Sequence, residues 1–574
     1  MKLTRRDFTG RAFAATLAGG IAGAGLSLDG TLGYTESEGI DAMATAQKLL
    51  AHYETVIRPQ LDKVYRGEWD SNVTGKDEDY ARKVEDEKKL TELLSDPATF
   101  AKLKEVAAAK IDDPIVARQI ELMFNQYASY QGNQDTIHRI TELSSAIAQK
   151  FNVFRAVVDG KEMSDNEIRD ILTSSDSSEL REKAWKASKV VGETMEADLT
   201  ELVAARNRLA KELGFRTYWE MALKLDEQDG DDVIRLFDEL ETLTRPLYRK
   251  MKSQVDAAMA AKCGISTKEL MPWHYQDPFF QETPTIFGGD YDFDGVYKNI
   301  DCAEICRNFY AGIGLPVDSI LERSSLYEQP GKCPHAFCID MDRNGDVRIL
   351  CNIVPSERWL STTLHELGHG VYGSTYIPQM PFLLRDAAHT FVTEGVAMMF
   401  ERFGRCADWL EAMGVPVVDK EGYNATVGPM RRAGLLVFTQ WCQVMVRFER
   451  AMYEDPSQNL SQLWWDLVER YQELRRPKEL RPDYAAKYHI SCAPCYYHNY
   501  ELGEMYSSQL RRAIFNAVAP GVDTLSGHYV GKPEAGEFMR ERVFAHGRKL
   551  RWDAMVKAST GAELSADAFA QDLE

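Results

Sequence analysis

The sequence predicts a mainly α-helical protein, and three observations support this class. Apolar residues recur at helical spacing almost continuously over residues 41–223 and again over 231–261. The same spacing returns near the C-terminus, over 426–452, 460–473 and 499–517. The 574 residues contain no Gly/Ser- or Pro-rich linker and no fixed-period repeat. We therefore expect one large body of two lobes.

The N-terminus has the pattern of an export signal. Arg5-Arg6 precedes a short Gly/Ala-rich apolar run over residues 12–24, which is typical of a twin-arginine signal peptide. We assign residues 1–30 to that signal and residues 40–574 to a single domain of two lobes. No later segment is long and apolar enough to span a bilayer. The sequence thus predicts a periplasmic or secreted protein with no stable membrane anchor.

Composition and charge narrow the class of function. The formal net charge is −20, and no sustained basic stripe is present, which argues against a nucleic-acid partner. Ten cysteines in an oxidising compartment favour disulfides. Cys492-Ala-Pro-Cys495 has the spacing of a redox motif, but no βαβ pattern surrounds it. A thioredoxin-like role is therefore not expected.

The middle of the chain interrupts the helical rhythm. Residues 271–294 are rich in Pro, Phe and Gly and are interpreted as loop. Residues 335–351 predict one β-hairpin that turns at Asn344-Gly345. The hairpin imitates the start of a calcium loop, but its twelfth position is Cys351 instead of Glu. Strands also flank the turn where helices would be needed, so calcium is excluded.

A metal-binding motif follows this hairpin directly. In His365-Glu366-Leu-Gly-His369 the two histidines are four residues apart, so a helix places both on one face. Two such imidazoles can bind zinc while Glu366 reaches a water as general base. The alternative interpretation of this motif is a solvated polar face on a buried helix that binds no metal. Glu394 lies in a later apolar segment where a carboxylate needs a cation, and it is the best third ligand. His389 is a rival that we consider structural.

Several blocks in order along the chain resemble the angiotensin-converting enzyme family of zinc peptidyl-dipeptidases. They extend from about residue 40 to about residue 515. The blocks are Trp69-Asp-Ser-Asn-Val-Thr74, Gly314-Leu-Pro316, His335-Ala336, 346–349, His365–His369, Pro381–Arg385 with Glu394 nine residues later, Trp464-Trp465-Asp-Leu467, Arg470-Tyr-Gln472 and Lys487-Tyr-His489.

The resemblance implies a fold and an activity. The fold is a two-lobed helical ellipsoid with a deep central cleft and a small β-hairpin beside the zinc helix. The activity is release of C-terminal dipeptides from peptides with a free C-terminus, with one Zn²⁺ per chain held by His365, His369 and Glu394. Alternatives are a zinc carboxypeptidase, a thimet-like oligopeptidase and an inactive scaffold or binding relative. The oligomeric state, monomer or dimer, stays open.

The resemblance also implies roles for further residues. His489 and Tyr500 correspond to the donors that stabilise the tetrahedral oxyanion, although one extra residue between them makes Tyr497 a rival for Tyr500. His335 and Ala336 correspond to the hairpin edge that binds the substrate backbone. The remaining substrate-binding residues form a clamp for the terminal carboxylate, and they are Lys487, Tyr497 and Gln281.

At three positions the sequence departs from the family pattern, and each departure changes what we expect of the site. Met398 stands where the family has an acid that braces a zinc-binding histidine, and we name no substitute from the sequence. Val468 and Asn499 stand where animal members have chloride-binding arginines, so chloride activation is not expected. The resemblance also suggests a disulfide between Cys333 and Cys351 across the hairpin.

Overall fold

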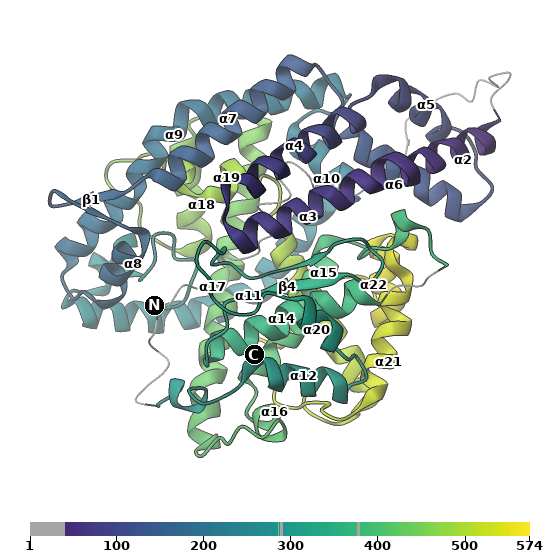
Figure 1. Cartoon of the computed structure of the whole chain (residues 1–574). Coiled ribbons are helices and arrows are strands. Elements are labelled where there is room, and N and C mark those ends of the chain that lie inside the picture. Colours follow the sequence, from purple (N-terminus) through teal and green to yellow (C-terminus); the bar gives the residue numbers. More distant parts are fainter. Residues whose placement is uncertain (1–40, 285, 287–290, 376–378) are drawn as a thin grey trace.

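A computed structural model gives the architecture of the chain and describes residues 41–284, 286, 291–375 and 379–574. The predicted signal peptide, residues 1–30, lies outside the described residues. Most of the described chain is helical, and its strands form two small sheets of two strands each (Figure 1). The mainly α class is therefore confirmed.

The N-terminal part is a series of amphipathic helices. Two of them, α5 (Pro97–Ala107) and α6 (Pro114–Ala128), begin where an aspartate caps a proline-started first turn, because the carboxylate accepts an otherwise unpaired backbone N–H. Asp96 accepts from Thr99 at 2.8 Å in this way, and Asp113 accepts from Ile115 at 2.8 Å. The helices are α2 (Ala42–His52), joined by a π-helical turn (Tyr53–Ile57) to α3 (Arg58–Thr74), then α4 (Asp77–Leu94), α5 (Pro97–Ala107), α6 (Pro114–Ala128), α7 (Gln134–Val153), α8 (Asp165–Ser174), α9 (Ser178–Glu212), α10 (Tyr218–Leu225) and α11 (Gly230–Cys263).

The C-terminal part is also helical. The three helices predicted there are present and slightly shifted or longer at their ends. The helices are α12 (Cys302–Gly312), α13 (Asp318–Arg323), α14 (Glu357–Ser374), α15 (Thr390–Glu401), α16 (Ala407–Ala412), α17 (Lys420–Glu454), α18 (Leu460–Gln472), α19 (Tyr488–Cys492), α20 (His498–Val518), α21 (Pro533–Arg542), α22 (Trp552–Thr560) and α23 (Asp567–Gln571).

Two antiparallel hairpins interrupt the helices, so the prediction of one hairpin was incomplete. The missed hairpin pairs β1 (Ala156–Val158) with β2 (Lys161–Met163). Its turn residues Asp159 and Gly160 have φ of 50° and 81°, as a two-residue turn of the Asp-Gly type requires. The predicted hairpin pairs β3 (Phe337–Asp340) with β4 (Val347–Leu350). Its connection spans residues 341–346 and is wider than the two-residue turn expected at Asn344-Gly345.

The expected disulfide between Cys333 and Cys351 is not present, because both are free cysteines. Burial raises the pKa of both thiols, but their surroundings differ. The next influence on Cys351 is Glu366, whereas Cys333 responds to the backbone of His335 and to Glu68. The two thiols therefore lie in different environments and are not paired across the hairpin.

Helices α14, α15 and α20 form the centre of the lower half in Figure 1. Helix α15 packs closely on both of its neighbours because glycines lie at the contacts. A Cβ on Gly395 would lie 2.7 Å from the Tyr506 ring and 2.8 Å from the Gly503 carbonyl oxygen of α20. A Cβ on Gly368 of α14 would lie 2.8 Å from Ala397 of α15. These contacts leave little freedom for the side chains that α14 and α15 carry.

The upper half of Figure 1 contains the purple and blue helices α3, α4, α6, α7 and α9, and the green helices α18 and α19 enter this half from the C-terminal part. One large core cluster includes residues of α7 and α9 together with residues of α14, α15, α17 and α20. A second cluster lies under α2–α6. The C-terminal segment that follows α18 is thus placed against N-terminal helices.

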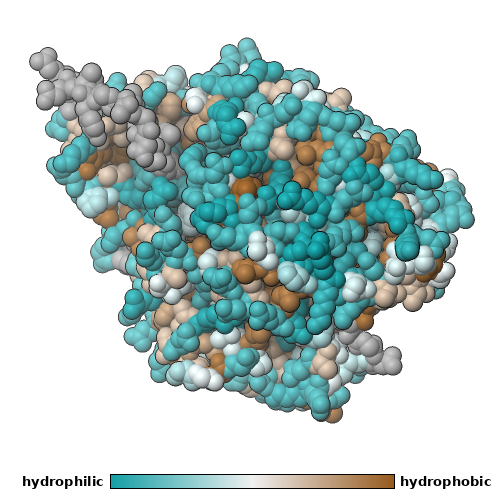
Figure 2. All heavy atoms as spheres, turned by 180° about the vertical axis from the view of Figure 1, so that it is seen from behind, coloured by the Kyte–Doolittle hydropathy of each residue, from teal (hydrophilic) through white to brown (hydrophobic). Residues whose placement is uncertain are grey.

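The face in Figure 2 is covered mainly by hydrophilic residues, with hydrophobic ones in small separate groups. None of the helices in the described ranges combines the length and apolar character needed to cross a membrane. Two cavities have volumes of about 10 and 40 Å³. The deep central cleft stays a prediction.

Candidate active site

Helices α14 and α15 bring three potential metal ligands together. Helix α14 starts at the Ser356 cap, whose hydroxyl accepts from the Trp359 N–H at 3.2 Å. The Nε2 atoms of His365 and His369 are 3.2 Å apart. Glu394 Oε2 lies 3.6 Å from His365 Nε2 and 3.8 Å from His369 Nε2. All three side chains are buried.

Each histidine is oriented by a partner on its other ring nitrogen. His365 Nδ1 donates to Glu401 Oε2 at 2.9 Å, and His369 Nδ1 shares a hydrogen bond with Thr393 Oγ1 at 2.7 Å. The hydrogen bonds at Nδ1 fix the orientation of both rings, so that the two Nε2 atoms face the same small space.

Glu401 and Thr393 are the supporting residues that sequence reasoning did not identify. Glu401 is seven residues after Glu394 in α15, which is two helical turns and therefore the same face. That spacing could have identified Glu401 from the sequence. Thr393 adjoins Glu394 and carries no charge, so nothing in the sequence distinguished it from a packing residue.

Glu394 supplies the test of whether these residues fit a metal. Glu394 is fully buried, and its Oε2 has no hydrogen-bond partner among the described residues. A buried carboxylate oxygen without a partner is costly. Two imidazoles and one carboxylate are the protein donor set of catalytic zinc. The residues fit zinc.

Glu366 follows His365 on α14 and is 5% exposed. Its carboxylate raises the pKa of the neighbouring Cys351 thiol, second to burial. His335 and Ala336 come just before β3, and β3 packs beside α14. Ala336 is buried and His335 half-buried. The hairpin edge thus lies near the helix that carries Glu366, as the resemblance implied.

A second group of predicted residues meets away from the histidines. Lys487 Nζ donates to Gln281 Oε1 at 2.7 Å, joining residues 206 positions apart. Lys487 Nζ lies 5.7 Å from the centre of the Tyr497 ring. Trp441 Nε1 in turn donates to Tyr497 Oη at 2.7 Å. Lys487, Gln281 and Tyr497 are therefore neighbours, and all three are buried.

His489, Tyr497 and Tyr500 connect this group to the histidine cluster. The His489 ring centre lies 5.0 Å from that of Tyr497 and 6.3 Å from that of Tyr500. Tyr496, which sequence reasoning overlooked, donates to Glu394 Oε1 at 3.4 Å. Its ring centre is 5.1 Å from that of Tyr500. Ring contacts near the start of α20 thus connect the Lys487 group to Glu394, through Tyr497, Tyr500 and Tyr496.

Comparison with known proteins agrees with the geometry. The sequence model of the angiotensin-converting enzyme family matches residues 40–275 and 295–571. A search of curated proteins found no match. The family match covers nearly the whole chain and includes every residue described above except Gln281. The family depends on zinc, and the His365, His369 and Glu394 cluster has the matching donor set. The chain therefore belongs to the angiotensin-converting enzyme family of zinc metallopeptidases.

Proposed function

We propose that this protein is a peptidyl-dipeptidase that removes dipeptides from the free C-terminus of oligopeptides. The observation that supports this specificity is the buried hydrogen bond from Lys487 to Gln281, beside Tyr497. An ammonium with adjacent neutral donors is what a terminal carboxylate needs for recognition. A peptidase that ignores the substrate C-terminus has no use for that arrangement at one end of its site.

Catalysis combines the bound metal with residues of the chain. Zinc held by His365, His369 and Glu394 would supply a Lewis acid and lower the pKa of a water. Glu366 takes a proton from the attacking water as general base. It later delivers that proton to the departing amine, so that the peptide bond breaks without releasing a strong base.

Hydrogen-bond donors stabilise the developing negative charge on the carbonyl oxygen. His489 and Tyr500 take this role, and their rings are 6.3 Å apart between centres. A donor aimed at the oxyanion acts more strongly in a buried site than in water. Tyr497 is the neighbour of Lys487 and serves the carboxylate clamp. His335 and Ala336 bind the substrate backbone at the hairpin edge.

Product analysis by mass spectrometry tests the proposal. The substrate is an N-terminally blocked peptide of about eight residues with a free C-terminus, incubated with the zinc-loaded chain. We expect successive loss of two C-terminal residues, abolished by a zinc chelator and restored by added zinc. The matched control is the same peptide with a C-terminal amide, which we expect to be cleaved poorly.

The other outcomes distinguish the alternatives. Release of single residues would indicate a carboxypeptidase and would remove the role of Lys487 in setting dipeptide length. Internal cuts that ignore the C-terminal amide would indicate an oligopeptidase. Absence of cleavage by zinc-loaded protein across several peptides would favour an inactive binding relative. Glu366→Gln separates chemistry from contamination, because it should bind peptide without cleaving it.

A further inference from the structure

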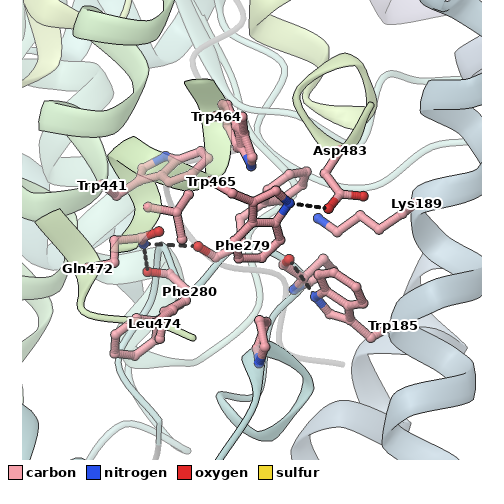
Figure 3. A pocket seen from close by; sticks show the side chains of 13 residues that line it. Trp185, Lys189, Phe279, Phe280, Trp441, Trp464, Trp465, Gln472, Leu474 and Asp483 are labelled. Carbon is pink, nitrogen blue, oxygen red and sulfur yellow. Dashed lines mark hydrogen bonds between the residues drawn. The ribbon is translucent and has the colours of Figure 1, made fainter. Parts of the chain in front are cut away.

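Lys189 of α9 is a buried cation that the proposed function does not use. Its side chain is 1% exposed and faces the smaller cavity, which is walled by aromatic rings (Figure 3). The wall includes Trp185, Phe279, Trp464 and Trp465. Burying an ammonium group costs free energy, so nearby groups must favour its positive charge.

No carboxylate lies within 4 Å of Lys189 in the described part of the chain, and aromatic faces surround it instead. Its Nζ is 3.1 Å from the centre of the Phe279 ring and 5.2 Å from that of Trp185. Figure 3 shows the side chain directed toward Asp483. Asp483 Oδ2 accepts from Trp465 Nε1 at 3.0 Å, while its buried Oδ1 has no partner among the described residues.

The Phe279 ring connects Lys189 to the carboxylate clamp. Lys487 Nζ lies 5.6 Å from the centre of that same ring. The two ammonium nitrogens are therefore at most about 9 Å apart, a range over which charges in a buried setting are weakly screened. Gln472 holds Phe279 in place by donating to its carbonyl oxygen at 3.0 Å.

The backbone makes a second connection between α9 and the clamp. Gly192 lies one turn after Lys189, and a Cβ there would collide with the carbonyl oxygen of Pro482. The short 3₁₀ helix Asp483–Ala486 follows Pro482 and ends directly before Lys487. Helix α9 thus contacts the segment that carries Lys487, both through Gly192 and through the attraction between Lys189 and Asp483.

We propose that Lys189 is a positioning residue that strengthens binding of the C-terminal carboxylate of the substrate. It acts through its neighbours Lys487 and Asp483. Its ammonium adds positive potential behind the clamp, and its attraction to Asp483 holds the segment before Lys487 against α9. This inference rests on the proposed function, because it needs a substrate carboxylate at Lys487.

The charge of Lys189 responds to its surroundings. Burial lowers the pKa of Lys189 to about 7; Asp483 and Asp277 act in the opposite direction, and Lys487 lowers it further. Asp483 is in turn influenced by Arg481 and Glu193. A substrate carboxylate at Lys487 adds a negative charge nearby and therefore favours protonated Lys189. Above pH 7, binding of the substrate is therefore coupled to uptake of a proton by Lys189. The affinity for the substrate then falls as pH rises.

Calorimetry on the full zinc-loaded chain carrying Glu366→Gln measures this coupling. We would titrate a pair of peptides, identical except for a C-terminal acid or amide, at pH 6.5 and pH 8.5. With an effective dielectric of about 20, a charge at this range changes affinity roughly tenfold. We expect the acid to bind about tenfold more weakly at pH 8.5, with roughly half a proton taken up near pH 7.7. The amide should show neither effect.

Variants assign the effect to Lys189. Lys189→Arg keeps the charge at every pH, so it should retain tight binding of the acid and lose the pH dependence. Lys189→Met should bind the acid about tenfold more weakly at pH 6.5, with no further change at pH 8.5. Lys186→Met is the matched control, because Lys186 lies on the same helix, is exposed and pairs with Glu182 at 2.6 Å. It should leave binding unchanged.

Two results would overturn different parts of the argument. If the chain with Lys189 intact binds acid and amide equally at pH 6.5, the carboxylate clamp fails, and the proposed function fails with it. If the acid is preferred, but its pH dependence and proton uptake are unchanged by Lys189→Arg, only the role of Lys189 fails. The comparison of the intact chain with Lys189→Arg, which keeps the charge, decides the role of Lys189 even if Lys189→Met does not fold.

Discussion

Glu401 should set the zinc affinity of the site. Its carboxylate is the partner of His365 Nδ1 at 2.9 Å, and Glu401→Gln keeps the shape while removing the charge. A hydrogen bond to a charged group contributes about 1.5–3 kcal/mol and a neutral one about 0.5–1.5 kcal/mol. The difference is about 1–1.5 kcal/mol, which corresponds to roughly a tenfold weaker zinc Kd. Losing such a partner commonly costs about 10- to 100-fold in metal affinity.

The assay is competition for zinc against a chromogenic chelator at fixed pH, on protein whose fold is checked by circular dichroism. Glu411→Gln is the matched control. Glu411 is an exposed glutamate paired with Lys420 at 2.7 Å, so the same chemical change there should leave the zinc Kd alone. A zinc Kd for Glu401→Gln equal to that of the unchanged chain would refute the claim that Glu401 orients and polarises His365.

Three further changes have defined outcomes. Burial raises the pKa of Glu449 to about 8 from 4.5, so the folded state holds a proton that the unfolded state releases, and stability falls as pH rises from about 4.5 to 8. Glu449→Gln should therefore gain about 3–4 kcal/mol relative to the parent between pH 5 and pH 8.5 in urea melts, and a constant difference would contradict this. Tyr500→Phe should lower kcat by about 10²–10³ with KM little changed, whereas Tyr497→Phe should mainly raise KM; the reverse pattern would exchange their roles. Gly395→Ala should cost about 1–3 kcal/mol by overpacking, while Gly434→Ala, with open space at its Cβ, should not lower Tm.

The helical class was predictable because it depends on local patterning. Periodicity located both ends of α18 and α20 to within one residue, whereas α17 begins six residues before the predicted start. The short hairpin at Asp159-Gly160 was missed, because three-residue strands carry too little alternation to compete with the surrounding helical pattern. The wide turn between β3 and β4 was also missed. There the side chain of Asp340 accepts the Arg343 N–H at 2.8 Å, a contact that no turn rule anticipated.

The candidate site was predictable where one short motif or one family block carried the chemistry. His365, His369 and Glu394 do meet, and so do Lys487 and Gln281, although Gln281 had the weakest support in the sequence. The partners of the histidines were not predictable in the same way. A supporting contact such as that of Thr393 depends on how α15 is rotated against α14, and packing sets that rotation.

The metal cluster and the carboxylate clamp differ in how far apart their members are in the chain. The three ligands and both partners of the histidines lie within residues 365–401, on two helices that adjoin in sequence and in space. The clamp instead joins positions separated by 206 residues. Closing a short loop costs less entropy than closing a long one, and short-range contacts form sooner. The order of assembly that follows is metal site first, peptide recognition last, so a chain that is still folding can be loaded with metal before it is able to bind a substrate.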